Sequence, residues 1–137
     1  FPDGYFFVKS QAHGLVLTVL ETGLLAAEVV VTQLDTSNYS GQLWKYEEGY
    51  LINKSSELVL DVPGGKLFPS ASIIQWHAKV LRSSRKNQMW GLSVDGHIHP
   101  QSCSSLVLSI DDSIVLKEGA ELKLAKRGAI ILDYQQW

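Results

Sequence analysis

The chain has 137 residues, of which 45% are apolar and 19% charged, and its formal net charge is −2. These values fit one globular domain, residues 1–137, and exclude a disordered chain. The charge balance gives no general attraction to nucleic acid, and no apolar run approaches the roughly 18 residues of a membrane span. We therefore expect a soluble single domain that has no membrane span and binds no nucleic acid.

The sequence holds one cysteine, Cys103. A single thiol excludes an internal disulfide framework, and no basic start followed by an apolar stretch marks a leader. Cys103 lies in the turn-like segment 100–105, where side chains tend to be exposed, so we expect it to be able to form an intermolecular disulfide. The sequence assigns no compartment.

Three landmarks recur along the chain in the same order. Gly4, Gly49 and Gly96 each precede a ring side chain and are spaced by 45 and 47 residues. Leu-Val-Leu triplets begin at residues 15, 58 and 106. A Gln-x-Trp (QxW) motif closes each copy, formed by Gln42 and Trp44, Gln88 and Trp90, and Gln135 and Trp137. The landmarks indicate three repeats, near residues 4–48, 49–95 and 96–137.

With these QxW repeats and its Leu-Val-Leu-Asp-Val segment, the chain resembles the ricin-B-type β-trefoil lectin family over its whole length. The resemblance implies an all-β fold with pseudo-threefold symmetry, built as a six-stranded barrel with a hairpin cap. One repeat cannot bury its own apolar face, so three must assemble. The resemblance also implies that the three QxW tryptophans lie in the core and that the three glutamines bond to turn backbone.

In the first repeat, residues 5–8 and 15–19 have the aromatic and β-branched composition of strands. Residues 20–31 match the pattern of an amphipathic helix as well. The repeat instead favours a turn near Gly23 and a strand at residues 28–32. We expect the strand.

In the second repeat, residues 50–53, 58–62 and 72–77 are strand patterns. The turn sequence Pro63-Gly64-Gly65 follows Asp61 after one residue. This turn leaves the carboxylate at a strand end beside a loop, where a ligand can reach it.

Asp61, Trp76 and Asn87, together with Gly64 in the turn, form the candidate carbohydrate site. A carboxylate accepts hydrogen bonds from neighbouring hydroxyls, an indole face stacks on the C–H side of a sugar ring, and an amide both donates and accepts. The alternative roles are structural, with Asp61 capping a turn and Trp76 in the core. Trp90 already fills the core position, so we favour the stacking role for Trp76.

Four basic residues, Lys79, Arg82, Arg85 and Lys86, follow Trp76 closely. The default interpretation is a solvated loop. Recognition of an acidic sugar or a phosphate headgroup is the sharper alternative.

The first and third repeats lack the site residues. At the positions of Asp61, Trp76 and Asn87 we place Thr18, Val31 and Gly41 in the first repeat and Ser109, Ala125 and Tyr134 in the third. Asp111 and Asp112 lie near the third position and could replace its carboxylate. We expect both of these sugar sites to be lost.

No pattern in the sequence indicates catalysis. His97 and His99 with Cys103 would make half a zinc site, but a fourth ligand is missing. There is no phosphate loop or nucleophile elbow, so we expect no enzyme, metal or cofactor.

Two functions remain. The first is a lectin module with one carbohydrate-binding site, for which the resemblance implies a galactose-type glycan partner. The second is a degenerate lectin fold used for self-assembly, as a homo-oligomer or larger assembly, or for protein contacts. The apolar tract 24–27 and the lone Cys103 suit that second function.

Overall fold

The computed structural model describes residues 1–110 and 119–137, apart from the side chain of Arg82. In this part of the chain all regular structure is strand or short 3-10 helix. The strands are β1 (Tyr5–Phe7), β2 (Val16–Val19), β3 (Val29–Thr32), β4 (Leu43–Glu47), β5 (Tyr50–Asn53), β6 (Val59–Asp61), β7 (Ile74–Trp76), β8 (Trp90–Leu92), β9 (Ile98–Pro100), β10 (Leu106–Ile110) and β11 (Ala120–Lys126). The 3-10 helices are η1 (Ser40–Gln42), η2 (Pro63–Gly65), η3 (Arg82–Ser84), η4 (Lys86–Gln88) and η5 (Asp133–Gln135).

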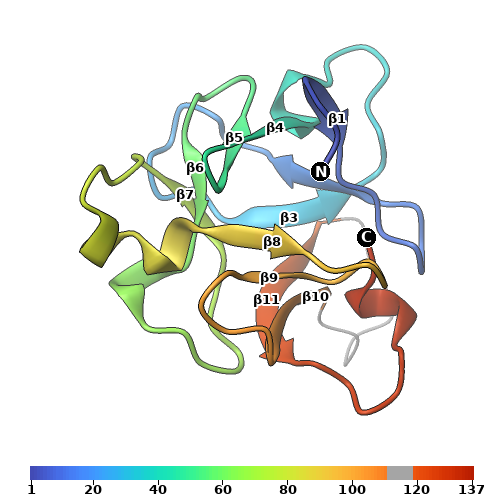
Figure 1. Cartoon of the computed structure of the whole chain (residues 1–137). Helices are drawn as coiled ribbons and strands as arrows, with labels where there is room; N and C mark the ends of the chain where they lie inside the picture. Colours follow the sequence, from blue (N-terminus) through green and yellow to red (C-terminus); the bar gives the residue numbers. More distant parts are fainter. Residues whose placement is uncertain (111–118) are drawn as a thin grey trace.

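The fold is an all-β trefoil in which the three repeats occupy separate sectors of the molecule. In Figure 1 the blue and cyan repeat lies at the upper right, the green and yellow repeat at the left, and the orange and red repeat at the bottom. Antiparallel pairs β2–β3, β6–β7 and β10–β11 form one hairpin in each repeat. None of the described helices is long or apolar enough to cross a membrane.

The predicted strand in the first repeat is confirmed against the helical alternative. Residues 22–23 and 25–26 form turns, and β3 then pairs with β2 from Val29 opposite Val19 to Thr32 opposite Val16. All four β3 side chains are buried. A run of β-branched residues buried on both faces favours a strand, because the branched side chains are restricted in a helix.

The third strand of each repeat is β3, β7 or β11, and these three segments meet at the centre of the molecule. Bridges join Glu28 to Ile74 and Ser72 to Lys123, and β11 pairs with β3 through Ala120 and Glu121. Each repeat therefore contacts both of the others through the backbone.

The QxW tryptophans occupy equivalent places in this frame. Their indole Nε1 atoms donate to the carbonyl oxygen of the last leucine in each Leu-Val-Leu triplet, over 3.1, 3.0 and 3.2 Å for Trp44, Trp90 and Trp137. Trp44 and Trp90 are fully buried, and truncation of such a side chain costs roughly 3–5 kcal/mol. Trp137 is only half-buried, although it packs against the same core.

The QxW glutamines form hydrogen bonds with the loops that follow β3, β7 and β11. The side-chain Nε2 atoms of Gln42, Gln88 and Gln135 donate to carbonyl oxygens of Gln33, His77 and Lys126 over 2.8 to 3.0 Å. Their Oε1 atoms accept from the main-chain N–H groups of Asp35, Lys79 and Gly128 over 2.8 to 3.1 Å. Asp35, Lys79 and Gly128 therefore occupy equivalent positions in the three repeats. The distance in sequence from each to its QxW glutamine is not the same in all three repeats, so the sequence spacing alone does not align them.

Candidate functional site

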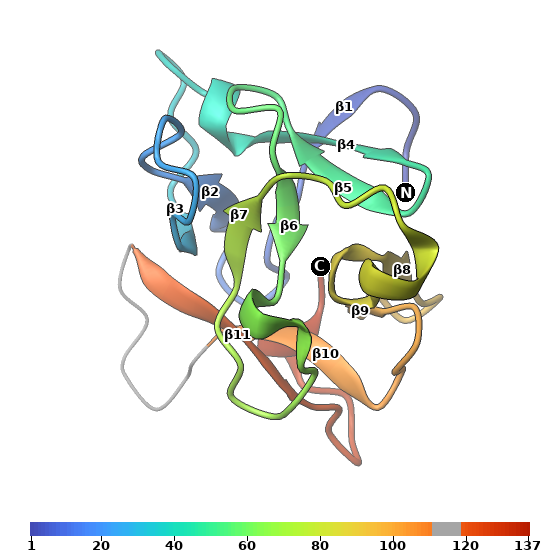
Figure 2. The ribbon, with the colours of Figure 1, turned by 90° about the vertical axis from the view of Figure 1, so that its left-hand side faces the viewer.

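A pocket of about 320 Å³ opens in the second repeat, between β6, η2, β7 and η4. Its lining includes Asp61, Gly64, Trp76 and Asn87, the four residues that the sequence assigns to a carbohydrate site. Figure 2 faces the β6–β7 pair, with η2 following the end of β6. The fold therefore brings together side chains that lie up to 26 residues apart in the chain.

The turn after β6 supplies one wall of the pocket. Pro63 begins η2, and Gly64 follows with a φ of +78°, in the left-handed region that favours glycine. No atom lies within 4 Å of the place where a Cβ on Gly64 would be. A side chain there would be strained by the backbone, although it would project into open space.

The carboxylate of Asp61 is held in a fixed orientation inside the pocket. Its Oδ2 accepts from Gln88 Nε2 at 2.7 Å, and its Oδ1 accepts from Asn87 Nδ2 at 3.4 Å. Burial, which leaves the residue 3% exposed, raises the pKa of Asp61, and the two amides and the charge of Lys79 oppose that rise only in part. The lone pairs that the amides do not use can accept hydroxyl groups.

The amide of Asn87 is engaged mainly by the protein. Its Nδ2 donates to the main-chain oxygen of Val62 at 2.9 Å as well as to Asp61, and its Oδ1 accepts from Lys79 Nζ at 3.1 Å. Both N–H groups are therefore used, and only the oxygen keeps an accepting position. The sequence suggested an amide that donates and accepts, whereas here both donors are directed to Val62 and, over a longer distance, to Asp61.

Trp76 provides the aromatic surface of the pocket. It ends β7 opposite the buried Val59 and is 37% exposed, whereas Trp90 of the same repeat is fully buried in the core. The His77 ring lies edge-on to the indole, with ring centroids 6.5 Å apart. An exposed indole beside a fixed carboxylate is able to stack on a pyranose whose hydroxyls bind the carboxylate.

Five lining residues were not assigned to the site from the sequence, namely Ala26, Pro63, Gly65, Ile74 and Lys79. Lys79 was recognised only as part of a basic loop, and its direction depends on the loop conformation. Ala26 comes from the first repeat, and no local pattern predicts its place in the pocket. The segment around it is fixed to β7, because Gln75 Nε2 donates to the carbonyl oxygens of Thr22 and Leu24 over 3.2 and 2.6 Å.

Comparison with known proteins identifies the family. No family model matches the sequence. Over 95 residues, or 68% of this chain, the sequence is 40% identical to Mucoricin from Rhizopus delemar, and the match spans 63% of that protein. The solution structure of the mdaA-1 domain has a TM-score of 0.90 and 31% identity, and the alignment covers 100% of this chain and 89% of that one.

The chain belongs to the ricin-B-type β-trefoil lectin family. The crystal structure of the earthworm R-type lectin C-half in complex with GalNAc has the same fold, with a TM-score of 0.75 and 18% identity over 98% of this chain and 95% of that one. The chain is thus a lectin-like trefoil module.

The strand register of this trefoil lectin corrects one aligned position. Val59 pairs with Trp76 in the second repeat, and the corresponding pair in the first repeat is Val16 with Thr32. The residue at the position of Trp76 is therefore Thr32, and the assignment of Val31 was wrong. Val31 pairs with Leu17 and is fully buried, because a shift of one residue along a strand moves a side chain to the opposite face.

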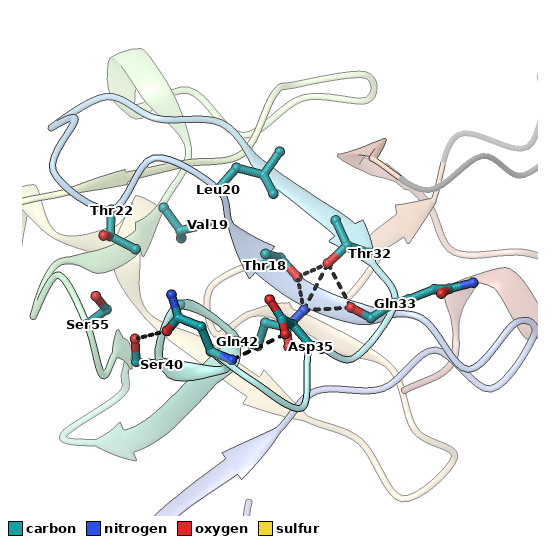
Figure 3. Close-up of a pocket in the computed structure, with 12 residues that line it drawn as sticks. Thr18, Val19, Leu20, Thr22, Thr32, Gln33, Asp35, Ser40, Gln42 and Ser55 are labelled. Carbon is teal, nitrogen blue, oxygen red and sulfur yellow. Dashed lines mark hydrogen bonds between the residues drawn. The ribbon is translucent and has the colours of Figure 1, made fainter.

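The first repeat has its own pocket of about 280 Å³, and hydrogen bonds within the protein engage Thr18, Thr32 and Gln42 in its lining. Thr18 and Thr32 hydroxyls lie 2.7 Å apart, and Gln42 Nε2 donates to Thr32 at 3.0 Å (Figure 3). Gly41 stands at the position of Asn87 and supplies no side chain. Although Asp35 brings a carboxylate to the rim, the aromatic surface is missing.

The third repeat also has a pocket at the corresponding place, about 410 Å³ in volume. Ser109, Ala125 and Tyr134 line it, so neither a carboxylate nor an indole takes the places of Asp61 and Trp76. Asp111 and Asp112, considered as replacements, lie outside the described residues.

The remaining candidates are placed as follows. Cys103 is half-buried, with its Sγ 3.3 Å from Ser105 Oγ. His97 is buried against Asp95, and His99 faces the main-chain oxygen of Pro100. Across residues 1–110 and 119–137, no three histidine, cysteine or acidic side chains gather as metal ligands.

Proposed function

We propose that the protein binds a galactose-type glycan through a single site in the second repeat. Trp76 stacks on the C–H face of the sugar ring, and Asp61 accepts its hydroxyl groups. Asn87 donates to the carboxylate, and Gly64 lines the pocket. The earthworm R-type lectin with GalNAc supports the ligand class by likeness of fold.

One observation carries this proposal. In the described structure, Trp76 is exposed at a pocket that also contains a buried carboxylate oriented by two amides. A core tryptophan would be covered, and a carboxylate that served only to cap a turn would not need an aromatic neighbour. The combination suits a ring with one apolar face and polar edges.

Lactose titration by calorimetry tests the proposal. We expect Trp76→Ala and Asp61→Asn each to weaken lactose binding at least about tenfold, since each removes a contact worth on the order of 1.5 kcal/mol or more. Because Trp76 is exposed, its removal should change the melting temperature little.

Two controls locate the site. Tyr39→Ala removes an exposed ring in the first repeat, and Asp35→Asn neutralises the carboxylate at the first-repeat pocket. Both variants should keep lactose affinity within about twofold of the native protein, which is a change in binding free energy below roughly 0.5 kcal/mol. Loss of binding in Asp35→Asn with retention in Asp61→Asn would move the site to the first repeat.

The alternative, self-assembly of a degenerate lectin fold, stays a prediction. Leu24 of its apolar tract is 52% exposed, which favours contact with another molecule, whereas Ala27 is 5% exposed and belongs to the core. The half-buried thiol of Cys103 is the covalent handle for such contact.

A further inference from the structure

Lys79 is held in the pocket wall by hydrogen bonds to its main chain and to its side-chain ammonium group. Its main-chain N–H donates to Gln88 Oε1 at 2.8 Å, and its carbonyl oxygen accepts from the Tyr50 hydroxyl. Its Nζ donates to Asn87 Oδ1 at 3.1 Å and to the main-chain oxygen of Ser84 at 3.2 Å. A surface lysine is usually mobile, whereas this ammonium group has a defined place beside the ligand space.

The ammonium group keeps donor capacity for a ligand. It has three N–H groups, and the two acceptors that it contacts are neutral oxygens. Among the described residues, no carboxylate forms an ion pair with Lys79. Asp61 lowers this positive potential from within the pocket, but each of its oxygens already accepts one amide hydrogen bond, from Asn87 or Gln88.

Further positive charge adjoins the same wall. The segment 79–86 contains four basic residues and no acidic residue. The Arg85 guanidinium lies over the Tyr50 ring, 5.8 Å from its centroid, and the hydroxyl of that ring holds the Lys79 carbonyl. A ligand approaching the rim of the pocket therefore meets positive charge, which attracts anions at separations below a Debye length of about 8 Å.

The charge is specific to this repeat. The equivalent positions, which bond through their main-chain N–H to Gln42 and Gln135, are Asp35 and Gly128. At this position the first repeat has the acidic Asp35, the second has the basic Lys79, and the third has Gly128, which has no side chain. The basic residue lies in the repeat that also has the exposed indole and the buried carboxylate.

We propose that the preferred ligand is an anionic saccharide, in which a neutral ring stacks on Trp76 and a carboxylate or sulfate group attached to it binds Lys79. This inference rests on the proposed function, because it names the ligand class of the same site. It makes Lys79 the residue that determines specificity among related sugars.

Calorimetric titration in 50 mM NaCl compares lactose, 6′-sialyllactose and lactose 6′-sulfate. At least one anionic sugar should bind about three- to tenfold more tightly than lactose, as expected for one partly exposed charge-assisted hydrogen bond. The sialyl and sulfate arms separate a carboxylate ligand from a sulfate ligand. The preference should shrink in 500 mM NaCl because salt screens the charge.

Three variants of Lys79 and one control variant test whether Lys79 causes the preference. Lys79→Met should reduce the ratio of anionic to neutral affinity to about one, while Lys79→Arg should retain most of it. The matched control Lys54→Met removes the same charge outside the pocket and should leave the ratio unchanged. Since the backbone bonds of residue 79 do not need its side chain, the variants should fold, and Lys79→Gln provides a second neutral replacement.

The outcomes separate this inference from the proposed function. Binding of lactose without any anionic preference, or a preference that survives in Lys79→Met and Lys79→Gln, overturns the anionic-ligand inference and leaves the lectin proposal standing. Binding of none of the three sugars by the native protein overturns the lectin proposal and the inference with it.

Discussion

Asp61 experiences two opposing influences on its proton affinity. Burial favours the neutral acid, whereas amide hydrogen bonds and the charge of Lys79 favour the carboxylate, and burial is the larger influence. Because the folded-state pKa is raised, this group contributes most to stability at low pH, and the contribution is lost as pH rises through the folded pKa. Ligand binding has the opposite dependence, since sugar hydroxyls need the ionised acceptor.

We therefore predict that lactose binding weakens on acidification at a pH above the ordinary aspartate range near 3.9. Titrations between pH 4 and pH 7 would measure this loss, with circular dichroism at each pH to confirm that the fold persists. Constant affinity down to pH 4 would show that the carboxylate of Asp61 does not accept hydrogen bonds from the ligand.

The individual site residues differ in how far the sequence could predict them. Asp61 and Trp76 could be proposed because their residue types are exceptions within a repeated apolar pattern, and both line the same pocket. The sequence placed Lys79 in a basic segment after Trp76 but could not predict its position in the pocket wall, since its direction depends on bonds to Gln88, Tyr50 and Ser84, which lie five to 29 residues away. Spacing in a sequence carries no information on such contacts.

At the scale of elements, each QxW glutamine is hydrogen-bonded to the loop that follows the third strand of its repeat, which is β3, β7 or β11. Gln42 makes hydrogen bonds to Thr32, Gln33 and Asp35, and it is 3% exposed. Gln88 makes the equivalent loop bonds and in addition holds Asp61. The same structural element thus has a second role in one repeat.

We predict that Gln42→Ala and Gln88→Ala each lower the free energy of unfolding by about 2 kcal/mol, because buried polar partners lose their hydrogen bonds. Urea denaturation would measure the loss. Only Gln88→Ala should also weaken lactose binding, since only that change frees the Asp61 carboxylate. Equal weakening by Gln42→Ala would contradict the assignment of the site to the second repeat.

The error at Val31 also belongs to the scale of elements. The QxW spacing correctly predicted the order of the hairpins and the strand at β3. It could not fix the register within that hairpin, because loops of different length separate the paired strands in each repeat. The hydrogen-bonded partners Val16 and Thr32 settle the register, and one residue decides which side chain faces the ligand.

At the scale of the whole molecule, the proposed single site makes valency the factor that decides overall affinity. A single shallow site binds weakly, and association of copies would raise the effective affinity. Exposed aliphatic side chains lie on different loops, including Leu20, Val80 and Ile130. These residues are the candidates for contacts between molecules, and Cys103 is the candidate for a covalent link.

We predict that oxidation at high protein concentration yields a disulfide-linked dimer through Cys103, which is half-exposed in a turn after β9. Non-reducing gel electrophoresis should reveal a dimer that Cys103→Ser abolishes. One disulfide joins only two copies, so light scattering in reductant would detect any apolar association separately. A monomer under both conditions would remove the main support for self-assembly.

The contribution of Ala26 to the second-repeat pocket has a consequence for how such a site can be inherited. Gln75 in β7 bonds to the first-repeat segment around Ala26, so the lining of the proposed site crosses a boundary between repeats. A gene fragment encoding residues 49–95 alone would carry Asp61, Trp76 and Asn87 but not the complete binding surface. Recombination that exchanges single repeats between related proteins would therefore also change the contacts between neighbouring repeats. Each exchange would alter the pocket of the adjacent repeat.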